Sequence, residues 1–404
     1  MSSRTKYFVV SASSCLTVLL LIGSVLGQSK SPEDTYKHIG VFSDVVSRIK
    51  SEYVEEPDMK SVTLGALNGM LEAIDPFASY LNADQYRDYL KNKDVKRAEV
   101  GLILSKKFGY VGVVGTITGS PASKASFTTG DMIESIGGVA TRDMPLAYAN
   151  MLLSGESGTT VELSVVRTRH PEPSPVKLTR AVFPLPAVES RMLADKVGYI
   201  NVDALSADLV KQVAGAVKQL QADGAQKLML DLRNCAIGSP EDGIALANLF
   251  LSKGRITYMV GQKVARQNFE ADPAKAITTL PVAILTNRGT ADAAEVAAAA
   301  LMDNKRAQLV GERTYGDAAL RRAITMEDGG AIILSVAKYY SPDGKAIQDV
   351  GVTPNNVVSD ADAQIDVDDN GEPLPEAPGA EKGQIKKVED DAVVKKALEL
   401  LAKG

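Results

Sequence analysis

The feature that most restricts the fold of this chain is an alternation of short apolar runs and helical stretches in its second half. The apolar runs cover 197–202, 227–232 and 282–286, and the helical stretches cover 206–221, 242–251 and 293–302. Parallel strands need a long crossover between them, usually a helix. The alternation therefore predicts an α/β core with parallel strands.

Residues 98–182 show a different pattern, in which short β runs are broken by glycine. The runs cover 101–104, 111–117, 132–136 and 161–166. A helix is predicted at 145–153, and the proline-rich stretch 171–175 is predicted to be a turn. We expect a compact β-rich module.

The first 27 residues have the pattern of a secretion signal. Arg4 and Lys6 supply positive charge, an apolar run covers 8–26, and small residues precede Gln28. Cleavage there predicts an exported protein, periplasmic or extracellular. The alternative is an uncleaved membrane anchor, because an apolar run of about 19 residues is nearly long enough to span a bilayer.

The next segment, 31–96, is predicted to be helical. Its first helix carries one apolar face, formed by Ile39, Phe42, Val45, Val46 and Ile49. A second helix, 61–74, ends at Asp75 because Pro76 disfavours helical backbone at the residue before it.

The C-terminal part is predicted to be a mobile acidic tail followed by a helix. Residues 360–383 are rich in Asp, Glu, Pro and Gly, a composition that buries too little apolar area to order the backbone. The last helix, 391–401, is expected to fold back onto the core through Val394, Leu398 and Leu401.

Composition excludes several functions. The net charge of -5 provides no broad basic surface for nucleic acid. Cys235 is the only cysteine left after signal removal, so an intramolecular disulfide is excluded. His38 and His170 lie in no triad-like or metal-binding pattern. We therefore expect neither a metal nor another cofactor.

Three separated stretches carry a family pattern. The first reads GALNGML and DPFASYL within 65–81, and the second reads VGLI at 100–103. The third begins with LDLRN at 230–234 and includes GERTYG at 311–316 and AKYYSPDGKAIQ at 337–348. Together they resemble the carboxyl-terminal processing, or tail-specific, serine peptidases. Phe77 stands where that family usually has histidine.

The resemblance implies a peptidase core of the ClpP/crotonase-like α/β type with an inserted β-rich PDZ domain and a small helical N-terminal segment. The expected divisions are a signal peptide at 1–27, the helical segment at 31–96, the PDZ domain at 97–183, the peptidase-like core at 184–358 and the acidic tail with its helix at 359–404.

The resemblance also implies a peptide-binding site at Val100, Gly101, Leu102 and Ile103. This loop would receive a terminal carboxylate on backbone N–H groups, and the peptide would add to the sheet as an extra strand. The expected partners are C-terminal tails of exported proteins or peptides. The alternative is that the glycines of this region serve only to form tight turns.

The family cuts peptides with a serine nucleophile and a lysine general base, oriented by a glutamine four residues after the lysine. Aligned on flanking residues, the nucleophile position is Asp292, the base position is Asp317 and the glutamine position is Arg321. All three are substituted. The oxyanion positions correspond to Gly238 and Ala293.

The loop before Gly238 also departs from the family, which has Asn-Pro-Gly-Gly where this chain has Cys235 to Gly238. One glycine is lost, and Ile237 is bulky where an unusual φ is expected.

These substitutions lead to the hypothesis that Asp292, Arg321 and Asp317 form a charge-compensated cluster without hydrolytic activity, because adjacent carboxylates repel unless a cation lies between them. The rivals are an aspartic dyad that activates water, a bound divalent ion, and a relocated nucleophile and base. The relocated candidates are Thr290, Ser239 and Cys235 as nucleophiles, with Lys338 and Lys345 as bases.

The sequence is compatible with three functions. The chain is predicted to be an inactive peptide-binding homologue, a pseudopeptidase. The alternatives are an active serine-type endopeptidase with relocated catalytic residues and a structural partner of an active paralogue. Membrane contact is expected only if residues 8–26 are retained.

Overall fold

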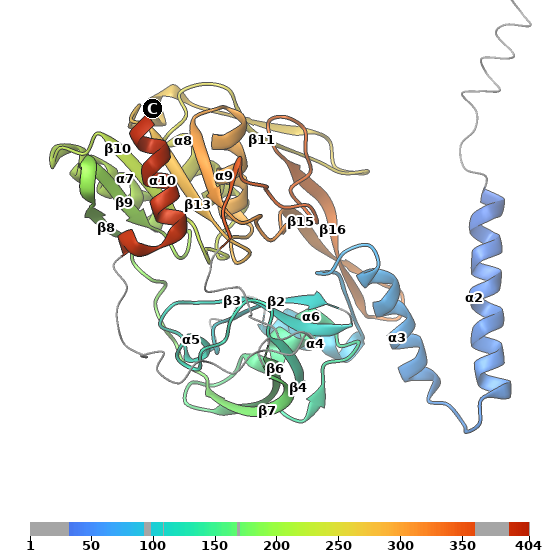
Figure 1. Cartoon of the computed structure of the whole chain (residues 1–404). Coiled ribbons are helices and arrows are strands. Elements are labelled where there is room, and N and C mark those ends of the chain that lie inside the picture. The colour runs from blue at the N-terminus through green and yellow to red at the C-terminus, as the bar shows by residue number, and fades with distance from the viewer. Residues whose placement is uncertain (1–31, 93–97, 108, 168–169, 360–387, 404) are drawn as a thin grey trace, which may run out of the picture. The chain divides into compact units, whose positions relative to one another are not determined.

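The computed structural model describes residues 32–92, 98–107, 109–167, 170–359 and 388–403 (Figure 1). The predictions for the signal segment and for 360–383 lie outside these residues. So do the side chains of His38 and His170. The chain forms two units that divide after Leu64.

The first unit contains α2 (Pro32–Glu52) and the start of α3 (Met59–Glu72), which continues into the second unit. Both helices form where the sequence predicts them. Among the described residues, each helix is too short or too polar to cross a membrane.

The core of the second unit is a six-stranded sheet of order β17-β14-β13-β10-β9-β8. Its strands are β8 (Glu189–Met192), β9 (Val197–Asn201), β10 (Lys227–Asp231), β13 (Val282–Thr286), β14 (Ala307–Gly311) and β17 (Asn356–Val357). Neighbours from β9 to β17 run parallel, and β8 is antiparallel to β9. The predicted parallel α/β core is confirmed.

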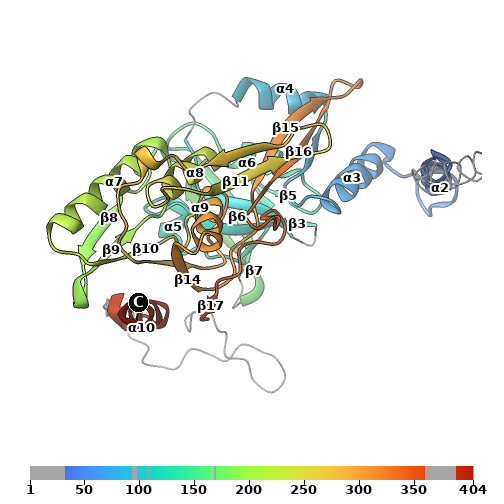
Figure 2. The ribbon, with the colours of Figure 1, turned by 90° about the horizontal axis from the view of Figure 1, so that it is seen from above.

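Helices cover both faces of this sheet. One face is covered by α7 (Ala207–Ala222), α8 (Pro240–Asn248) and α9 (Ala293–Asp303), and the other by α10 (Ala392–Lys403). Figure 2 shows α7 and α10 on opposite sides of the strands. The sheet is therefore the middle layer of three, as its nearly continuous apolar strands require.

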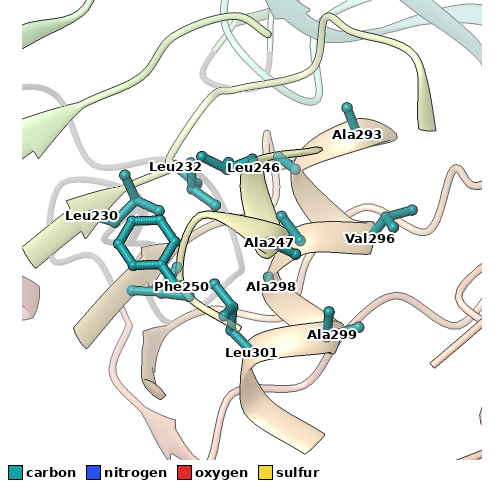
Figure 3. Packing of buried hydrophobic residues seen from close by; sticks show 14 of the residues in the cluster. Leu230, Leu232, Leu246, Ala247, Phe250, Ala293, Val296, Ala298, Ala299 and Leu301 are labelled. Atoms are coloured by element: carbon teal, nitrogen blue, oxygen red, sulfur yellow. The ribbon is translucent and has the colours of Figure 1, made fainter. Parts of the chain in front are cut away.

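The start of α9 is fixed by close packing against α8. Residues 293–301 of α9 are all buried, and alanines make up most of them (Figure 3). A Cβ on Gly243 of α8 would overlap the backbone carbonyl of Ala293. Small residues therefore set how closely the two helices approach and where the first turn of α9 lies.

The C-terminal helix returns to the core as predicted, with Val394 and Leu401 buried and Leu398 partly buried. At its start the Asp391 carboxylate accepts hydrogen bonds from the backbone of Val393 and Val394.

Asp391 also pairs with Arg233 at 2.6 Å, and Arg233 binds Asp231 at the end of β10. The hydroxyl of Tyr199 donates to Asp231 at 2.8 Å. This buried polar network joins α10 to the strand that leads into residues 234–238.

A second sheet has the order β1-β16-β11-β12, with β15 also paired to β16. Its strands are β1 (Ser79–Leu81), β11 (Arg255–Val260), β12 (Gln267–Glu270), β15 (Ala319–Thr325) and β16 (Ala331–Tyr340). The sequence patterns did not predict these strands. Strand β15 places Arg321 beside the loop that carries Asp317.

The β-rich region forms a third sheet of order β2-β3-β4-β6-β7, with β5 paired to β4. Its strands are β2 (Leu102–Lys107), β3 (Tyr110–Thr116), β4 (Met132–Ile136), β5 (Val139–Ala140), β6 (Thr160–Arg167) and β7 (His170–Thr179). Its helices are α5 (Pro121–Lys124) and α6 (Leu146–Leu153), and α4 (Ala83–Asn92) precedes the sheet.

The prediction of a turn at 171–175 is wrong, because this stretch lies within β7. Pro175, for example, pairs with Ser164 of β6. Strand β7 is at the sheet edge, where a residue without an N–H can sit with its nitrogen directed away from the ladder.

Candidate functional site

Asp292 lies at the sharp turn that begins α9. Its backbone has φ 51° and ψ −118°, a conformation that residues with a Cβ rarely adopt. Its N–H donates to Oε2 of Glu295 at 3.2 Å. Residues flanking the turn, including Ala291 and Ala293, are buried. The local structure thus presents a partly buried carboxyl at the head of a buried helix.

Glu295 is the centre of the site's hydrogen bonding. Its carboxylate is fully buried and accepts from the hydroxyl of Thr314 and from the N–H groups of Gly316 at 2.7 Å, Asp317 at 2.8 Å and Asp292. Burial raises the pKa of Glu295 to about 8, while its hydrogen-bond donors act in the opposite direction. Glu295 therefore holds the loops of Asp292 and Asp317 together.

Asp317 forms an ion pair with Arg321, and both side chains are largely buried. The Arg321 guanidinium lies 4.2 Å from the centre of the Phe77 ring, within the range of a cation–π interaction. Phe77 makes an edge contact with Tyr315, with ring centres 6.0 Å apart. Asp317, Arg321, Phe77 and Tyr315 thus form one packed group.

The ionisation of both aspartates of the site is disfavoured. The pKa of Asp292 is raised well above its ordinary value by burial first and by Asp317 next, against the effect of Arg321. The pKa of Asp317 is also raised by burial, although Arg321 opposes the rise. In the described part of the chain, Arg321 hydrogen-bonds to Asp317 and affects Asp292 only through its charge.

Gly238 and Ala293, the predicted oxyanion positions, lie side by side. Gly238 has φ 144°, and a Cβ there would lie 2.9 Å from the Cβ of Ala293. Within the described residues, the N–H groups of Gly238 and Ala293 donate to no protein acceptor. Two unpaired N–H donors therefore remain close to Asp292, and such donors are the groups that stabilise an oxyanion.

The unusual backbone of this loop falls on Asn234, with φ 59°, and on Gly238, whereas Ile237 has an ordinary negative φ. The prediction of an unusual φ at 237 is therefore wrong. Asparagine tolerates the left-handed region, so the turn is made at Asn234.

The other candidate nucleophiles are held in structural roles. Cys235 is fully buried, and burial raises the pKa of its thiol. The Thr290 hydroxyl donates to the Leu232 carbonyl at 2.8 Å, and Ser239 caps α8.

The candidate lysines form no hydrogen bond with these candidate nucleophiles in the described part of the chain. Lys338 pairs with Asp349 at 2.6 Å, and Lys345 is exposed. Across the residues that the structure describes, no hydrogen bond joins one of these lysines to a candidate nucleophile. The described residues also contain no cluster of three acidic, His or Cys side chains suited to a metal ion.

The predicted peptide-binding residues lie at the start of β2. Gly101 has φ 79°, and a Cβ there would overlap Ser120. Val100 is buried, and Leu102 packs on the core of the β-rich region. Ile103 belongs to a different cluster and packs against the group of buried residues Val114, Ala236 and Ala291. Strand β2 therefore lies against the α/β core.

A cavity of about 560 Å³ lies near this contact. Its lining includes Ser105, Asp131, Arg288, Glu312 and Arg313. Neither Asp292 nor Asp317 lines it, but Thr314 and Tyr315 do, so the cavity borders the loop that leads to Asp317.

Comparison with known proteins assigns the family. The model of peptidase family S41 matches residues 196–358. The chain is 33% identical to a carboxyl-terminal-processing protease of Synechocystis sp. over 318 residues, which cover 77% of this chain and 74% of that protein. The chain belongs to peptidase family S41. It is also 30% identical to the carboxy-terminal processing protease CtpA of Bacillus subtilis, over 82% of this chain and 71% of that protein.

The S41 fold is also seen in a solved structure. The photosystem II D1 C-terminal processing protease superposes with a TM-score of 0.65 at 25% identity, covering 79% of this chain and 92% of that one. The mixed α/β architecture of this chain is thus that of a known S41 peptidase.

Two residues that organise the site, Glu295 and Phe77, have roles that the sequence patterns do not predict. For Glu295 the available signal is a lone acidic residue within the alanine-rich run Ala293 to Ala300. The contact between Phe77 and Arg321 joins residues far apart in the sequence, and no local pattern predicts it.

Proposed function

We propose that this chain is an exported S41 homologue that binds the C-terminal tails of proteins or peptides and has lost Ser/Lys proteolysis. The observation that carries the proposal is the Asp317–Arg321 ion pair beside Asp292, at the three positions where the family resemblance implies base, orienting residue and nucleophile. A pseudopeptidase of this kind retains the family scaffold and its tail recognition.

The chemistry of the site supports loss of acyl transfer. Peptide cleavage by this family requires a hydroxyl whose proton is taken by a nearby base. Asp292 carries no such hydroxyl, and its attack on an amide would form a mixed anhydride while expelling a far poorer leaving group. Asp317 is held by Arg321. Neither residue can therefore perform the step that serine and lysine perform.

The β-rich region supports tail recognition. The sheet β2-β3-β4-β6-β7 fits a PDZ domain over the predicted range 97–183, inserted before a core of the ClpP/crotonase-like type. The positive φ of Gly101 and its close approach to Ser120 shape the loop that precedes β2. A terminal carboxylate would bind the backbone N–H groups of this loop, with the tail beside β2.

The location of the protein follows from the sequence pattern of its first 27 residues, which favours export to the periplasm or beyond. The partners we propose are therefore tails of exported proteins. If 8–26 is retained as an anchor, the same site would face outward from a membrane.

The first test is a peptidase assay on the purified mature protein with casein and with peptides carrying free apolar C-termini. We expect no release of new amino termini. In a triple variant, Asp292→Ser, Asp317→Lys and Arg321→Gln, we expect cleavage at least about 100-fold above background, because nucleophile and base return to the scaffold.

An active peptidase is the second candidate, favoured by the two unpaired N–H groups of Gly238 and Ala293 beside Asp292. Cleavage by the wild-type protein that is abolished by Asp292→Ala or Asp317→Ala would establish it. A structural partner of an active paralogue would instead co-purify with that paralogue whether or not Gly101 or Leu102 is altered.

A further inference from the structure

Among the residues that the structure describes, no partner is found for the backbone groups of alternate residues along the outer edge of β2. Strand β2 lies at the end of its sheet. The Gly101 carbonyl accepts from Ile117 of the β3 side, and Ile103 pairs with Gly115. Hydrogen-bonded pairs alternate with non-bonded pairs in an antiparallel ladder, so the backbone groups of Leu102 face outward.

The same holds for Leu104 beyond the bulge that follows Ile103. Leu104 pairs with Val113, whose N–H and C=O are both bonded on the other side, to Asp131 and Gly130. The polar backbone groups of Leu104 are therefore directed to the outer edge. An added strand could bond to Leu102 and Leu104.

The next outward position is already taken. The N–H of Lys106 donates to the carbonyl of Pro76 at 3.2 Å. Three residues after Pro76, the hydroxyl of Ser79 accepts from the N–H of Ala147, in the first turn of α6, at 3.3 Å. The segment from Pro76 to Ser79 therefore runs from β2 to α6, and it closes the space between them at this end.

Phe77 fixes this closing segment. Its side chain is 8% exposed and belongs to the same apolar cluster as Val100 and Leu104 of the β2 side and Leu146 of α6. Outside that cluster it is held by Arg321 and by the edge of Tyr315. A ligand would have to expel this buried ring to pass Lys106.

We propose that the outer edge of β2 is a short site, which takes only about the last three residues of an apolar free C-terminus. The tail pairs with Leu102 and Leu104, and Pro76–Phe77 ends the free edge at Lys106. Residues before the last three leave the sheet and make no strand contacts. This inference rests on the proposed function, since it limits the length of ligand that the same site accepts.

The test uses calorimetric titration of the full chain with peptides of three, five and eight residues that share one apolar C-terminal triplet. We expect the three dissociation constants to agree within about twofold, because the extra residues find no free edge. An affinity that rises more than tenfold from three to eight residues would overturn the length limit while leaving tail binding intact.

Two variants at one position sharpen the result. Phe77→Ala removes the ring that holds the closing segment, and we expect the eight-residue peptide to gain about tenfold in affinity while the three-residue peptide is unchanged. Phe77→Leu keeps an apolar side chain there and should behave as the wild type. Equal responses of the two peptides to Phe77→Ala would contradict the assignment.

Hydrogen exchange separates this inference from the proposed function. In the free protein the Lys106 amide should exchange at least about 10-fold more slowly than those of Leu102 and Leu104, because only Lys106 has an acceptor. Equal exchange rates at these three amides would refute the closure of the edge at Lys106, whatever the result of the peptide titrations. If free and C-terminally amidated peptides all fail to bind while Lys106 is protected, tail binding is wrong and the closed edge stands.

Discussion

The pocket around Asp292 and the outer edge of β2 handle their polar groups in opposite ways. In the pocket, Glu295 accepts four hydrogen bonds and Asp317 is paired with Arg321, so both carboxylates are satisfied by the protein itself. Among the described residues, Nε of Arg321 and the N–H groups of the two oxyanion positions lack a partner there. At the edge, Leu102 and Leu104 direct backbone groups outward. Paired carboxylates need no ligand, whereas an open edge leaves backbone groups for one to bind.

The two regions also differ in the strain of their backbone. Asp292 and Gly101 both have positive φ, but an aspartate in such a conformation costs free energy that a glycine does not. The pocket therefore keeps an unfavourable turn at Asp292, and Glu295 holds this turn in place. The side chain that the turn presents is an aspartate, whereas the family's chemistry needs a serine.

The largest effect is expected at Glu295. In Glu295→Gln an amide replaces a buried carboxylate, and its NH2 group would face backbone N–H donors. We expect the free energy of unfolding to fall by about 3 kcal/mol in urea denaturation. Glu162→Gln, at an exposed carboxylate on β6, should change it by less than about 0.5 kcal/mol. Equal losses would show that the pocket does not depend on Glu295.

Gly101→Ala tests the other region. The new Cβ would strain a φ of 79° and overlap Ser120, and we expect a loss of about 2 kcal/mol. Gly158→Ala is the matched control, since its φ is 85° but no atom lies within 4 Å of the added Cβ. In Gly158→Ala we expect the free energy of unfolding to fall by about 1 kcal/mol, which measures the backbone strain alone. Equal losses in the two variants would argue against close packing at Gly101.

The pH dependence of stability reports on the carboxyls of the pocket. Their pKa values are raised on folding, so the folded state binds more protons and their stabilising effect is full below about pH 4. It is lost as pH rises through the folded pKa values, including that of Glu295 at about 8. We expect the free energy of unfolding to be greater at pH 5 than at pH 8 by roughly 2 kcal/mol.

Asp292→Asn should reduce this slope, because it removes one group whose pKa is raised on folding. Asp208→Asn, at the exposed start of α7, should leave the slope unchanged. Thermal unfolding measured across this pH range provides the comparison, and a slope of the opposite sign in the wild type would show that the pocket carboxyls stay ionised.

The smallest effect is expected for Arg321→Lys. The positive charge remains, but the planar group that stacks on Phe77 is lost, and stability should fall by about 1 kcal/mol. Arg322→Lys, at the exposed next residue, serves as the control. No difference between the two variants in denaturation would show that the stacking contributes little.

Sequence patterns predicted the parts of the fold whose signal is local. The strands β9, β10 and β13 and the helices between them follow from apolar runs and helical spacing, because both faces of this sheet are covered. The prolines of β7 suggested a turn, since their place at a sheet edge cannot be read from the sequence. Strands β15 and β16 were missed because they pair with each other and with distant segments.

The site was predicted to a similar extent. The proximity of Asp292, Asp317 and Arg321 was expected from the family resemblance, and the ion pair between Asp317 and Arg321 was part of that hypothesis. The role of Glu295 depends on donors from residues 314–317, which only the tertiary fold brings to it. The contact of Phe77 with Arg321 spans more than 240 positions, and its energy depends on stacking geometry that spacing does not encode.

The position of α10 imposes an order on how this chain can mature. Met229, Ala283 and Leu285 are fully buried in the cluster that includes this helix, yet α10 follows every other described element in the sequence. One apolar side of the central sheet thus stays uncovered until α10 has been synthesised. The complete three-layer core, and with it the anchoring of Arg233 by Asp391, forms only from that point on.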